Sequence, residues 1–324
     1  MPERFDRILV IDLLGGLGDL LLVLPAIHAL ATRNPGARLC VLTHAPAEEL
    51  LRADAAVHRV EVSGRGDEAA TVAAVLRRFG PDLVVSTTRH SDIPALLTDY
   101  PGRVVDDLWR NPPADARVGE RYLAILRAEG LIATDGPIDG TVTLTGAEID
   151  AGRRTVGAAG PVAVLLPEAG MAVKQWPTAR WATLAGELDA LGVTALTCTR
   201  KPIEIPPARP LPRTSLRGIA GYFAAVARSG VVIGADTGPL RLASAMGAPV
   251  VGLFGPTTAQ RYGLGGGVNL QGLPYCPHRT PLAISEAPCW WDARCPLRAE
   301  GPACLADISV GAVRAVALDL LPLA

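Results

Sequence analysis

Two turns that each join an apolar strand to a helix carry the residues best suited to chemistry in this 324-residue sequence. The first turn spans residues 15–19 (GGLGD), and the second spans residues 234–239 (GADTGP). Glycines at a helix start let a ligand approach the backbone closely, and the helix dipole favours an anion there. Both turns are therefore candidate ligand sites.

Asp19 ends the first turn, and two interpretations of it stay open. Its carboxylate could accept a proton as a catalytic base. It could equally cap the following helix, which is a common use of aspartate. An NAD-type site would need an acidic residue after the strand at 39–43, and none is present. The absence of a Tyr-x-x-x-Lys pair also disfavours a nucleotide-dependent epimerase or dehydrogenase.

The second turn offers several groups to a phosphate. Gly238 and Pro239 begin a helix with exposed N–H groups, Thr237 can donate its hydroxyl, and Arg241 can reach an anion from the first turn. The alternative is that Asp236 only caps a helix that has proline in its first turn. A separate cation motif favours the anion interpretation.

That cation motif is KQWP at residues 174–177, which follows the first strand of the second half. Lys174 and Trp176 could be a surface lysine packed on an aromatic ring. They could also be a phosphate clamp beside a ring that stacks on a sugar or a base. Because the motif follows a parallel strand, it is expected at the same sheet edge as Asp236.

Four cysteines lie within thirty residues of a segment rich in glycine and proline: Cys276, Cys289, Cys295 and Cys304. Four thiols in an irregular segment predict a structural zinc or iron site that holds a loop without a core of its own. The sequence has no Cys-x-x-Cys pair, so the alternative of unconnected thiols, or of His278 in place of one thiol, stays open.

The composition limits the classes of function. With 31 basic and 32 acidic residues the net charge is −1, which argues against a nucleic-acid partner. The N-terminus lacks the features of a signal peptide, and no apolar run approaches the roughly 20 residues of a membrane helix. We therefore expect a cytoplasmic protein, with peripheral contact at the inner face of the membrane left open.

The order of the apolar runs predicts an α/β protein with two doubly wound domains. The expected boundary divides an N-terminal domain, residues 1–155, from a C-terminal domain, residues 156–324. The expected strands are 7–13, 38–43, 57–62, 83–86, 162–166, 193–198, 231–234 and 250–254. The expected helices are 19–32, 47–52, 68–79, 178–191, 218–228, 239–246 and 310–320.

Taken in order, the motifs resemble those of glycosyltransferase family 9, the heptosyltransferase-like enzymes. They are GLGDL at 16–20, LPAIHAL at 24–30, KQWP at 174–177, DTGP at 236–239, GAPV at 247–250, FGPT at 254–257 and CLADI at 304–308. The resemblance implies a GT-B fold, in which two Rossmann-like domains face a central cleft. The N-terminal domain would receive the acceptor and the C-terminal domain the sugar nucleotide, with ADP-heptose as the expected donor.

The resemblance also implies roles for single residues. Asp19 matches the catalytic base, Lys174 a cation near the donor phosphates, and Thr237 with Gly238 the diphosphate loop. The family inverts the anomeric centre by direct displacement and needs no catalytic metal. Its protein-modifying branch carries a four-cysteine iron site, which supports the metal interpretation of the cysteines here.

Three positions depart from the family pattern. Arg241 stands where relatives have histidine, so a permanent cation replaces a group that could move a proton. Glu204 is the one acidic residue left in an altered loop, where it could contact the ribose of the donor. Glu168 stands where glycine is usual, and its carboxylate could repel a diphosphate.

The acceptor is the least defined partner. Gly18, Arg89 and His90 are candidate acceptor-binding residues, since the last two follow the strand at 83–86 and could contact an anionic acceptor. The expected acceptor is a hydroxyl of a glycan, a lipopolysaccharide core or a secondary metabolite. The alternative function is a non-catalytic protein of the same fold that binds a sugar nucleotide.

Overall fold

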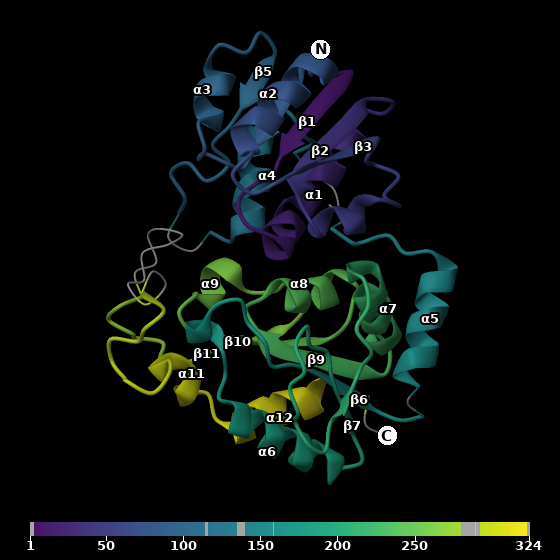
Figure 1. The fold of residues 1–324 in the computed structure, drawn as a ribbon, viewed down its shortest axis with the longest axis vertical. Helices are drawn as coiled ribbons and strands as arrows, with labels where there is room; N and C mark the ends of the chain where they lie inside the picture. Colours follow the sequence, from purple (N-terminus) through teal and green to yellow (C-terminus); the bar gives the residue numbers. More distant parts are fainter. Residues whose placement is uncertain are drawn as a thin grey trace. The chain divides into compact units, whose positions relative to one another are not determined.

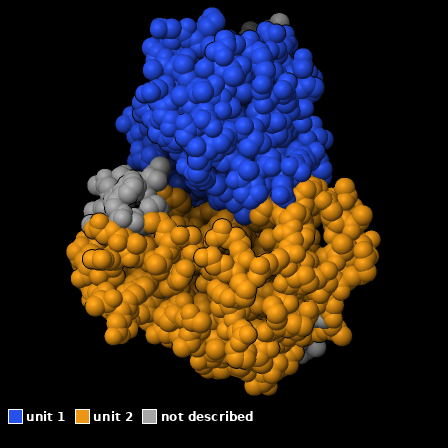
Figure 2. All heavy atoms as spheres, in the orientation of Figure 1, with its two compact units in different colours: residues 1–143 blue, residues 144–324 orange. Residues whose placement is uncertain are grey.

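The computed structural model describes residues 3–113, 116–134, 140–157, 159–279, 289 and 292–322. The chain divides into two compact units, residues 1–143 and residues 144–324, which Figure 2 shows in different colours. The division falls before the helix Gly146–Val156, whereas the sequence placed the boundary after residue 155. The helix belongs with the second unit because it packs there, as shown below.

Unit 1 is a five-stranded parallel sheet in the order β3-β2-β1-β4-β5 (Figure 1). The strands are β1 (Arg7–Ile11), β2 (Arg38–His44), β3 (Arg59–Ser63), β4 (Leu83–Ser86) and β5 (Arg103–Val105). The helices are α1 (Leu17–Arg33), η1 (Ala47–Leu51), α2 (Glu68–Phe79), α3 (Ile93–Thr98) and α4 (Val118–Ala128). Strands β1, β2 and β4 are almost wholly buried because helices cover both faces of the sheet.

Unit 2 is a six-stranded parallel sheet in the order β11-β10-β9-β6-β7-β8. The strands are β6 (Val162–Leu166), β7 (Thr194–Thr197), β8 (Arg209–Pro210), β9 (Gly230–Ala235), β10 (Val250–Phe254) and β11 (Val268–Gln271). The helices are α5 (Gly146–Val156), η2 (Ala172–Lys174), α6 (Thr178–Asp189), α7 (Leu216–Val226), α8 (Gly238–Ala245), α9 (Ala259–Tyr262), α11 (Ala303–Asp307) and α12 (Val310–Leu320). In Figure 1, α6 and α12 lie on one side of the sheet and α7 and α8 on the other.

The predicted strands and helices agree with these elements to within a few residues. The sequence missed β5, β8, β11, η2, α3, α4 and α5, and also the short helices α9 and α11. These elements are short or weakly apolar; α5, for example, buries only Gly152 and Val156.

Along the described part of the chain, no helix is both long and apolar enough to cross a membrane.

Each sheet has one point where the strand order reverses: between β1 and β4 in unit 1, and between β6 and β9 in unit 2. In open α/β sheets, the loops that follow such neighbouring strands separate to opposite faces, and ligands bind at the carboxyl ends of the strands there. The two candidate turns begin there, since β1 leads to Asp19 and β9 leads to Asp236. The fold therefore places both chemical motifs at the usual ligand position of an open α/β sheet.

Helices α5 and α7 pack at unusually close range. A Cβ atom on Gly152 would overlap the backbone carbonyl of Gly221, and one on Gly221 would lie 2.8 Å from the carbonyl oxygen of Glu148. Arg217 fastens the same helices by donating to both oxygens of the Glu148 carboxylate at 2.6 Å. Glycine at these positions is thus required by the distance between two backbones.

We expect Gly152→Ala to lower the free energy of unfolding by about 1–3 kcal/mol, because overlap outweighs the higher helix propensity of alanine. Urea unfolding measures the change. Gly186→Ala in α6 is the matched control: nothing lies within 4 Å of the added Cβ, so it should stabilise by up to about 1 kcal/mol. Equal effects of the two substitutions would contradict the close packing.

Candidate functional site

The centre of the site in unit 2 is the carboxylate of Asp236, which follows β9. Its side chain is 8% exposed, and it lies between two cations. Arg241 donates to Oδ1 at 2.8 Å, and the Nζ of Lys174 lies 3.3 Å from Oδ2. The structure thus brings together the two motifs that the sequence placed at one edge of the sheet, 62 residues apart in the chain.

The charges at this centre are only partly balanced. Burial alone would raise the pKa of Asp236, but the charges of Arg241 and Lys174 outweigh burial and hold the pKa below its ordinary value. Asp236 is therefore ionised at neutral pH. Two cations and one carboxylate leave one net positive charge at the start of α8, where the helix dipole also attracts an anion.

Two hydroxyl groups beside Asp236 add candidate donors to an anion. Thr237 is the N-cap residue of α8, yet its side chain makes no capping bond and its buried Oγ1 has no described hydrogen-bond partner. Thr257, which follows β10, is 3% exposed. Its Oγ1 lies close enough to Asp236 to help lower that pKa but makes no well-aligned hydrogen bond to a described residue. A buried donor left unpaired costs about 1–3 kcal/mol, so a phosphate oxygen between these groups would be stabilised.

Thr257 is a site residue that the site prediction missed. The available signal was its position directly after a buried strand, in the segment FGPT. Parallel strands present the residues beyond their carboxyl ends at one edge of the sheet, so β10 delivers Thr257 beside β9 and Asp236.

The structure corrects the prediction for Trp176. Its side chain is 2% exposed, its Nε1 donates to the carbonyl of Ile308 at 3.0 Å, and its ring meets that of Trp181 edge to face at 4.9 Å. The ring belongs to the core under α6 and α12, so it cannot stack on a sugar or a base. The tryptophan fixes the Lys174 segment to the core instead.

Arg241 also differs from the expectation that it reaches an anion directly. It is nine-tenths buried, and its NH2 group donates to Asp236 and, at 2.5 Å, to the carbonyl of Tyr262. The guanidinium therefore anchors Asp236 and the end of α9.

Gly238 and Pro239 form the first turn of α8 as expected. Glu204 is exposed on the loop between β7 and β8, and its donor contact stays a prediction.

Glu168 does not stand free beside the anion site, as the sequence suggested it could. Its carboxylate accepts hydrogen bonds from the backbone N–H groups of Arg200 and Lys201, the latter at 3.1 Å. The residue thus ties the loop after β6 to the loop after β7.

In unit 1, Asp19 occupies the third position of α1 and not the N-cap, which is Gly16. Its Oδ2 accepts from the backbone N–H of Gly16 at 3.1 Å, and the carboxylate packs against Gly15 so closely that a Cβ there would overlap it. Asp19 is half-buried. Asp19 thus caps the start of α1 from within its first turn, and its role as base stays a prediction.

His90 contacts the loop that leads to Asp19, whereas Arg89 pairs with an acidic residue outside that loop. The Nε2 of His90 lies 3.0 Å from the carbonyl oxygen of Leu13. Arg89 pairs with Asp107 at 2.7 Å and its side chain is 56% exposed. Gly18, the second residue of α1, is half-buried beside Asp19. Acceptor binding by these residues stays a prediction.

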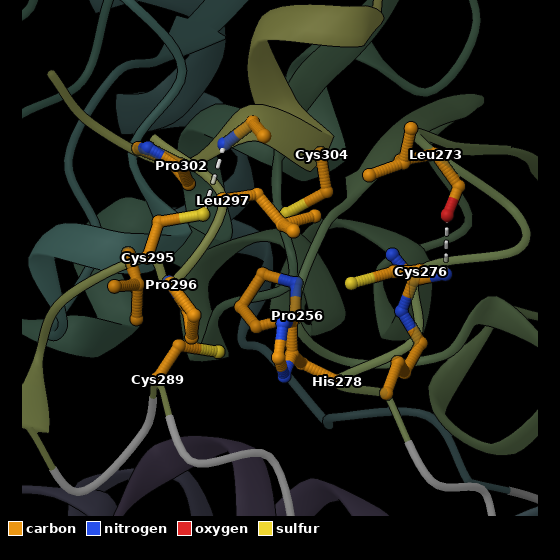
Figure 3. Close-up of a pocket in the computed structure, with 13 residues that line it drawn as sticks. Pro256, Leu273, Cys276, His278, Cys289, Cys295, Pro296, Leu297, Pro302 and Cys304 are labelled. Atoms are coloured by element: carbon orange, nitrogen blue, oxygen red, sulfur yellow. Dashed lines mark hydrogen bonds between the residues drawn. The ribbon is translucent and has the colours of Figure 1, made fainter. Parts of the chain in front are cut away.

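The four predicted cysteines converge on one cavity of ≈ 20 Å³ in unit 2 (Figure 3). Cys276, Cys289, Cys295 and Cys304 line it together with His278 and Arg279. The backbone N–H of Ala303 lies 3.5 Å from the sulfur of Cys295. Within the described residues, no three groups of the metal-ligating types form a ready-made metal site.

Arg279 connects this cavity to the anion site. Its guanidinium donates to the carbonyls of Gly255, Leu273 and Gly272 at 2.8–2.9 Å. Gly255 lies two residues before Thr257, so the cysteine segment is fastened to the chain that carries the Thr257 hydroxyl. The loop after β10 is thus tied to the cysteine segment through the guanidinium of Arg279.

Comparison with known proteins agrees with this arrangement. Residues 109–275, just over half of the chain, match Glycosyltransferase family 9 (heptosyltransferase). No curated protein sequence matches the chain.

Several solved structures share its fold. A family 9 glycosyl transferase from Veillonella parvula is 16% identical, with 99% of this chain and 98% of that chain covered and a TM-score of 0.77. The E. coli ADP-heptose lps heptosyltransferase II is 19% identical, with coverage of 97% and 98% and a TM-score of 0.68. The iron-containing dodecameric glycosyltransferase TibC from enterotoxigenic E. coli is 14% identical, with coverage of 98% and 76% and a TM-score of 0.61.

These structures confirm the predicted GT-B fold of two parallel α/β sheets. The family match adds what the fold cannot, because it rests on the sequence of the region that contains Lys174, Asp236 and Thr257. The chain belongs to glycosyltransferase family 9, the heptosyltransferase family.

Proposed function

We propose that this glycosyltransferase moves a heptose-like sugar from a nucleoside diphosphate, ADP-heptose, to a hydroxyl acceptor with inversion of the anomeric centre. The observation that carries the proposal is the buried group of Lys174, Asp236 and Arg241 at the start of α8. Support for the donor comes from the similar fold of the E. coli heptosyltransferase II, whose name specifies ADP-heptose.

The donor diphosphate binds at the start of α8. Lys174 attracts it with a positive charge, and Arg241 fixes Asp236 so that this charge stays in place. Thr237 and Thr257 donate their hydroxyls to phosphate oxygens. When the bond to the sugar breaks, negative charge grows on the departing diphosphate, and preorganised donors stabilise that charge most. This chemistry requires no catalytic cofactor.

The acceptor side belongs to unit 1. Asp19 removes the proton from the acceptor hydroxyl as that oxygen attacks the anomeric carbon, so one base and no covalent intermediate suffice. Gly18, Arg89 and His90 contact the acceptor. The acceptor is a hydroxyl of a glycan, a lipopolysaccharide core or a secondary metabolite. We place the reaction in the cytoplasm, at the inner face of the membrane where the acceptor is a glycolipid.

We also propose that the four cysteines hold a structural zinc or iron ion. Their chemistry fits, because four thiolates suit a tetrahedral zinc or iron site. Their positions fit in part. All four cysteines line one cavity, but among the described residues no three metal-ligating groups lie close enough together to hold one ion. Binding would draw the thiols together and fix the loop that Arg279 fastens to Gly255. The iron-containing TibC shares the fold and lends support.

Donor binding tests the anion site. We expect Thr237→Val and Thr257→Val each to weaken ADP binding by about tenfold or more, since a hydrogen bond to a charged group contributes about 1.5–3 kcal/mol. Calorimetry measures the dissociation constants. A thermal-shift screen of the parent protein against ADP-, GDP- and UDP-sugars identifies the nucleobase of the donor, because ligand binding to the folded state raises Tm.

Thr183→Val is the control for this pair, because the hydroxyl of Thr183 bonds only within α6, to the carbonyl of Ala179. It should leave ADP affinity unchanged. If both the Thr237 and the Thr257 variant bind ADP with the affinity of the parent protein, the diphosphate does not bind at the start of α8.

The Asp19→Asn variant tests the role of Asp19 as the catalytic base. We expect kcat to fall about 10²- to 10⁴-fold while the affinity for the donor stays within twofold, because only proton removal is lost. Product formation by mass spectrometry measures the transfer. Asp99→Asn, an exposed aspartate of the same unit, is the control. Turnover at the parent rate would refute the assignment, and a parent protein that binds donor without transferring sugar would favour the non-catalytic alternative.

Elemental analysis tests the metal. We expect close to one equivalent of zinc or iron per chain after purification, and a loss of most of it in Cys276→Ser and Cys295→Ser, because structural sites need all four ligands. Cys198→Ser is the control, since Cys198 is not among the residues that line the cavity. Less than about a fifth of an equivalent in the parent protein would count against a structural site.

A further inference from the structure

Gln271 is a polar residue beside the anion site for which the proposed mechanism has no role. It ends β11, the edge strand that pairs with β10 in the sheet of unit 2 (Figure 1). It is half-buried and lies opposite Phe254 in the last pair of the ladder between these two strands. The turn at residues 254–259, which follows β10, carries Thr257. Gln271 is therefore placed where its side chain can act on that turn.

The side chain of Gln271 spans the turn at residues 254–259. Its Oε1 accepts from the backbone N–H of Ala259 at 2.7 Å. Its Nε2 donates to the carbonyl oxygens of Phe254 at 3.0 Å and of Gly255 at 3.1 Å. A side-chain amide has two hydrogens and one carbonyl oxygen, so these three bonds can engage all of them. One side chain thus joins the first residues of the turn to its last residue.

The partners fix the orientation of the amide. The N–H of Ala259 can only donate, and the two carbonyls can only accept, so a rotated amide would lose all three bonds. Ala259 is also the first residue of α9, and the first N–H groups of a helix have no partner within the helix. Gln271 therefore satisfies a group that α9 cannot satisfy itself.

The start of the turn has two further supports. The carbonyl of Gly255 also accepts from the Nε of Arg279 at 2.9 Å. A Cβ atom on Gly255 would lie 2.8 Å from the side chain of Leu305 and 2.9 Å from the sulfur of Cys304. The start of the turn is thus held by close packing as well as by hydrogen bonds to two side chains.

The chain beyond the turn is fixed to the group around Asp236. Arg241 donates to Asp236 at 2.8 Å and to the carbonyl of Tyr262, the last residue of α9, at 2.5 Å. Gln271 holds the start of the same helix. The buried side chain of Thr257 therefore lies, along the chain, between two attachments that leave it little freedom to move.

We propose that Gln271 is a positioning residue for donor binding: its amide holds the turn at residues 254–259 so that the hydroxyl of Thr257 is preorganised toward a phosphate oxygen. The proposal rests on the proposed binding of the donor diphosphate at the start of α8. Gln271 acts through Thr257 and is not itself a ligand of the diphosphate. A glutamine suits this position because one acceptor and two donors are needed at opposite ends of the turn.

Hydrogen exchange tests these contacts without any ligand. Gln271→Met keeps a side chain of similar length and removes all three bonds. We expect the backbone amides of residues 255–262 to exchange about fivefold faster or more, because local opening then costs fewer hydrogen bonds. Mass spectrometry of peptides from this region measures the rates. Parent-like exchange in Gln271→Met would overturn the proposal.

Asn269→Leu is the matched control. Asn269 is two residues earlier on β11, and its amide also binds backbone groups, the N–H and the carbonyl of Leu264. Its substitution should leave exchange at residues 255–260 unchanged. Equal effects of the Gln271 and Asn269 substitutions on residues 255–260 would mean that any damage to β11 loosens the turn, and would refute a specific role of Gln271.

ADP binding tests the consequence for the anion site. Gln271→Met should weaken ADP binding about 3- to 10-fold in calorimetry, because a displaced hydroxyl loses part of its bond to the phosphate. Gln271→Asn keeps the amide but is one methylene shorter, so it cannot span the turn and should lose a similar factor. Asn269→Leu should stay within twofold of the parent protein. Parent affinity in both Gln271 variants would contradict the proposal.

A double-mutant cycle identifies the route by which Gln271 acts. If it acts through Thr257, Gln271→Met should cause no further loss of ADP affinity in a protein that already carries Thr257→Val. A general structural role would instead lower the affinity by the same factor in both backgrounds, and that outcome would refute the positioning of Thr257.

The two readouts separate failure of this inference from failure of the proposed function. If the parent protein binds no ADP but Gln271→Met still speeds exchange in the turn and Asn269→Leu does not, Gln271 positions the turn and the assigned donor site is wrong. If the parent protein binds ADP and Gln271→Met changes neither exchange nor affinity, the donor site stands and this inference is wrong.

Discussion

The arrangement of unit 2 depends on compensating one buried negative charge. Asp236 cannot remain ionised at 8% exposure without cations, and removing one partner of a buried pair costs about 3–5 kcal/mol. Arg241 and Lys174 supply the cations from two different loops, and Arg241 also grips the end of α9 through Tyr262. One carboxylate thus holds three segments at the edge of the sheet and leaves a net positive charge at a helix start.

Both units place their candidate site residues after the strands where the order of the sheet reverses, but the residues differ in chemistry. The strand order reverses once in each sheet, and the loops beyond that point separate. In unit 1 this position presents the carboxylate of Asp19. In unit 2 it presents two cations around Asp236 and the buried hydroxyls of Thr237 and Thr257. One topology therefore positions a carboxylate in unit 1 and a group of cations in unit 2, through the residues that follow the central strands.

Polar contacts help to organise the described part of the segment after β10. Arg279 binds three backbone carbonyls, and four cysteines line a shared cavity beside it. Glu168 plays a comparable part between β6 and β7 by accepting two backbone N–H groups. These contacts help to position Thr257 and the loops around Asp236.

The sequence by itself determined the parallel α/β class, most of the strands and helices, and the two turns with Asp19 and Asp236, because apolar runs and glycine-rich turns are local signals. Only the tertiary structure decided which polar groups meet. It buried Trp176 against Trp181, turned Arg241 toward Asp236, occupied Glu168 with backbone N–H groups and brought Thr257 into the site. Each outcome depends on residues far apart in the chain, whose distance no local pattern records.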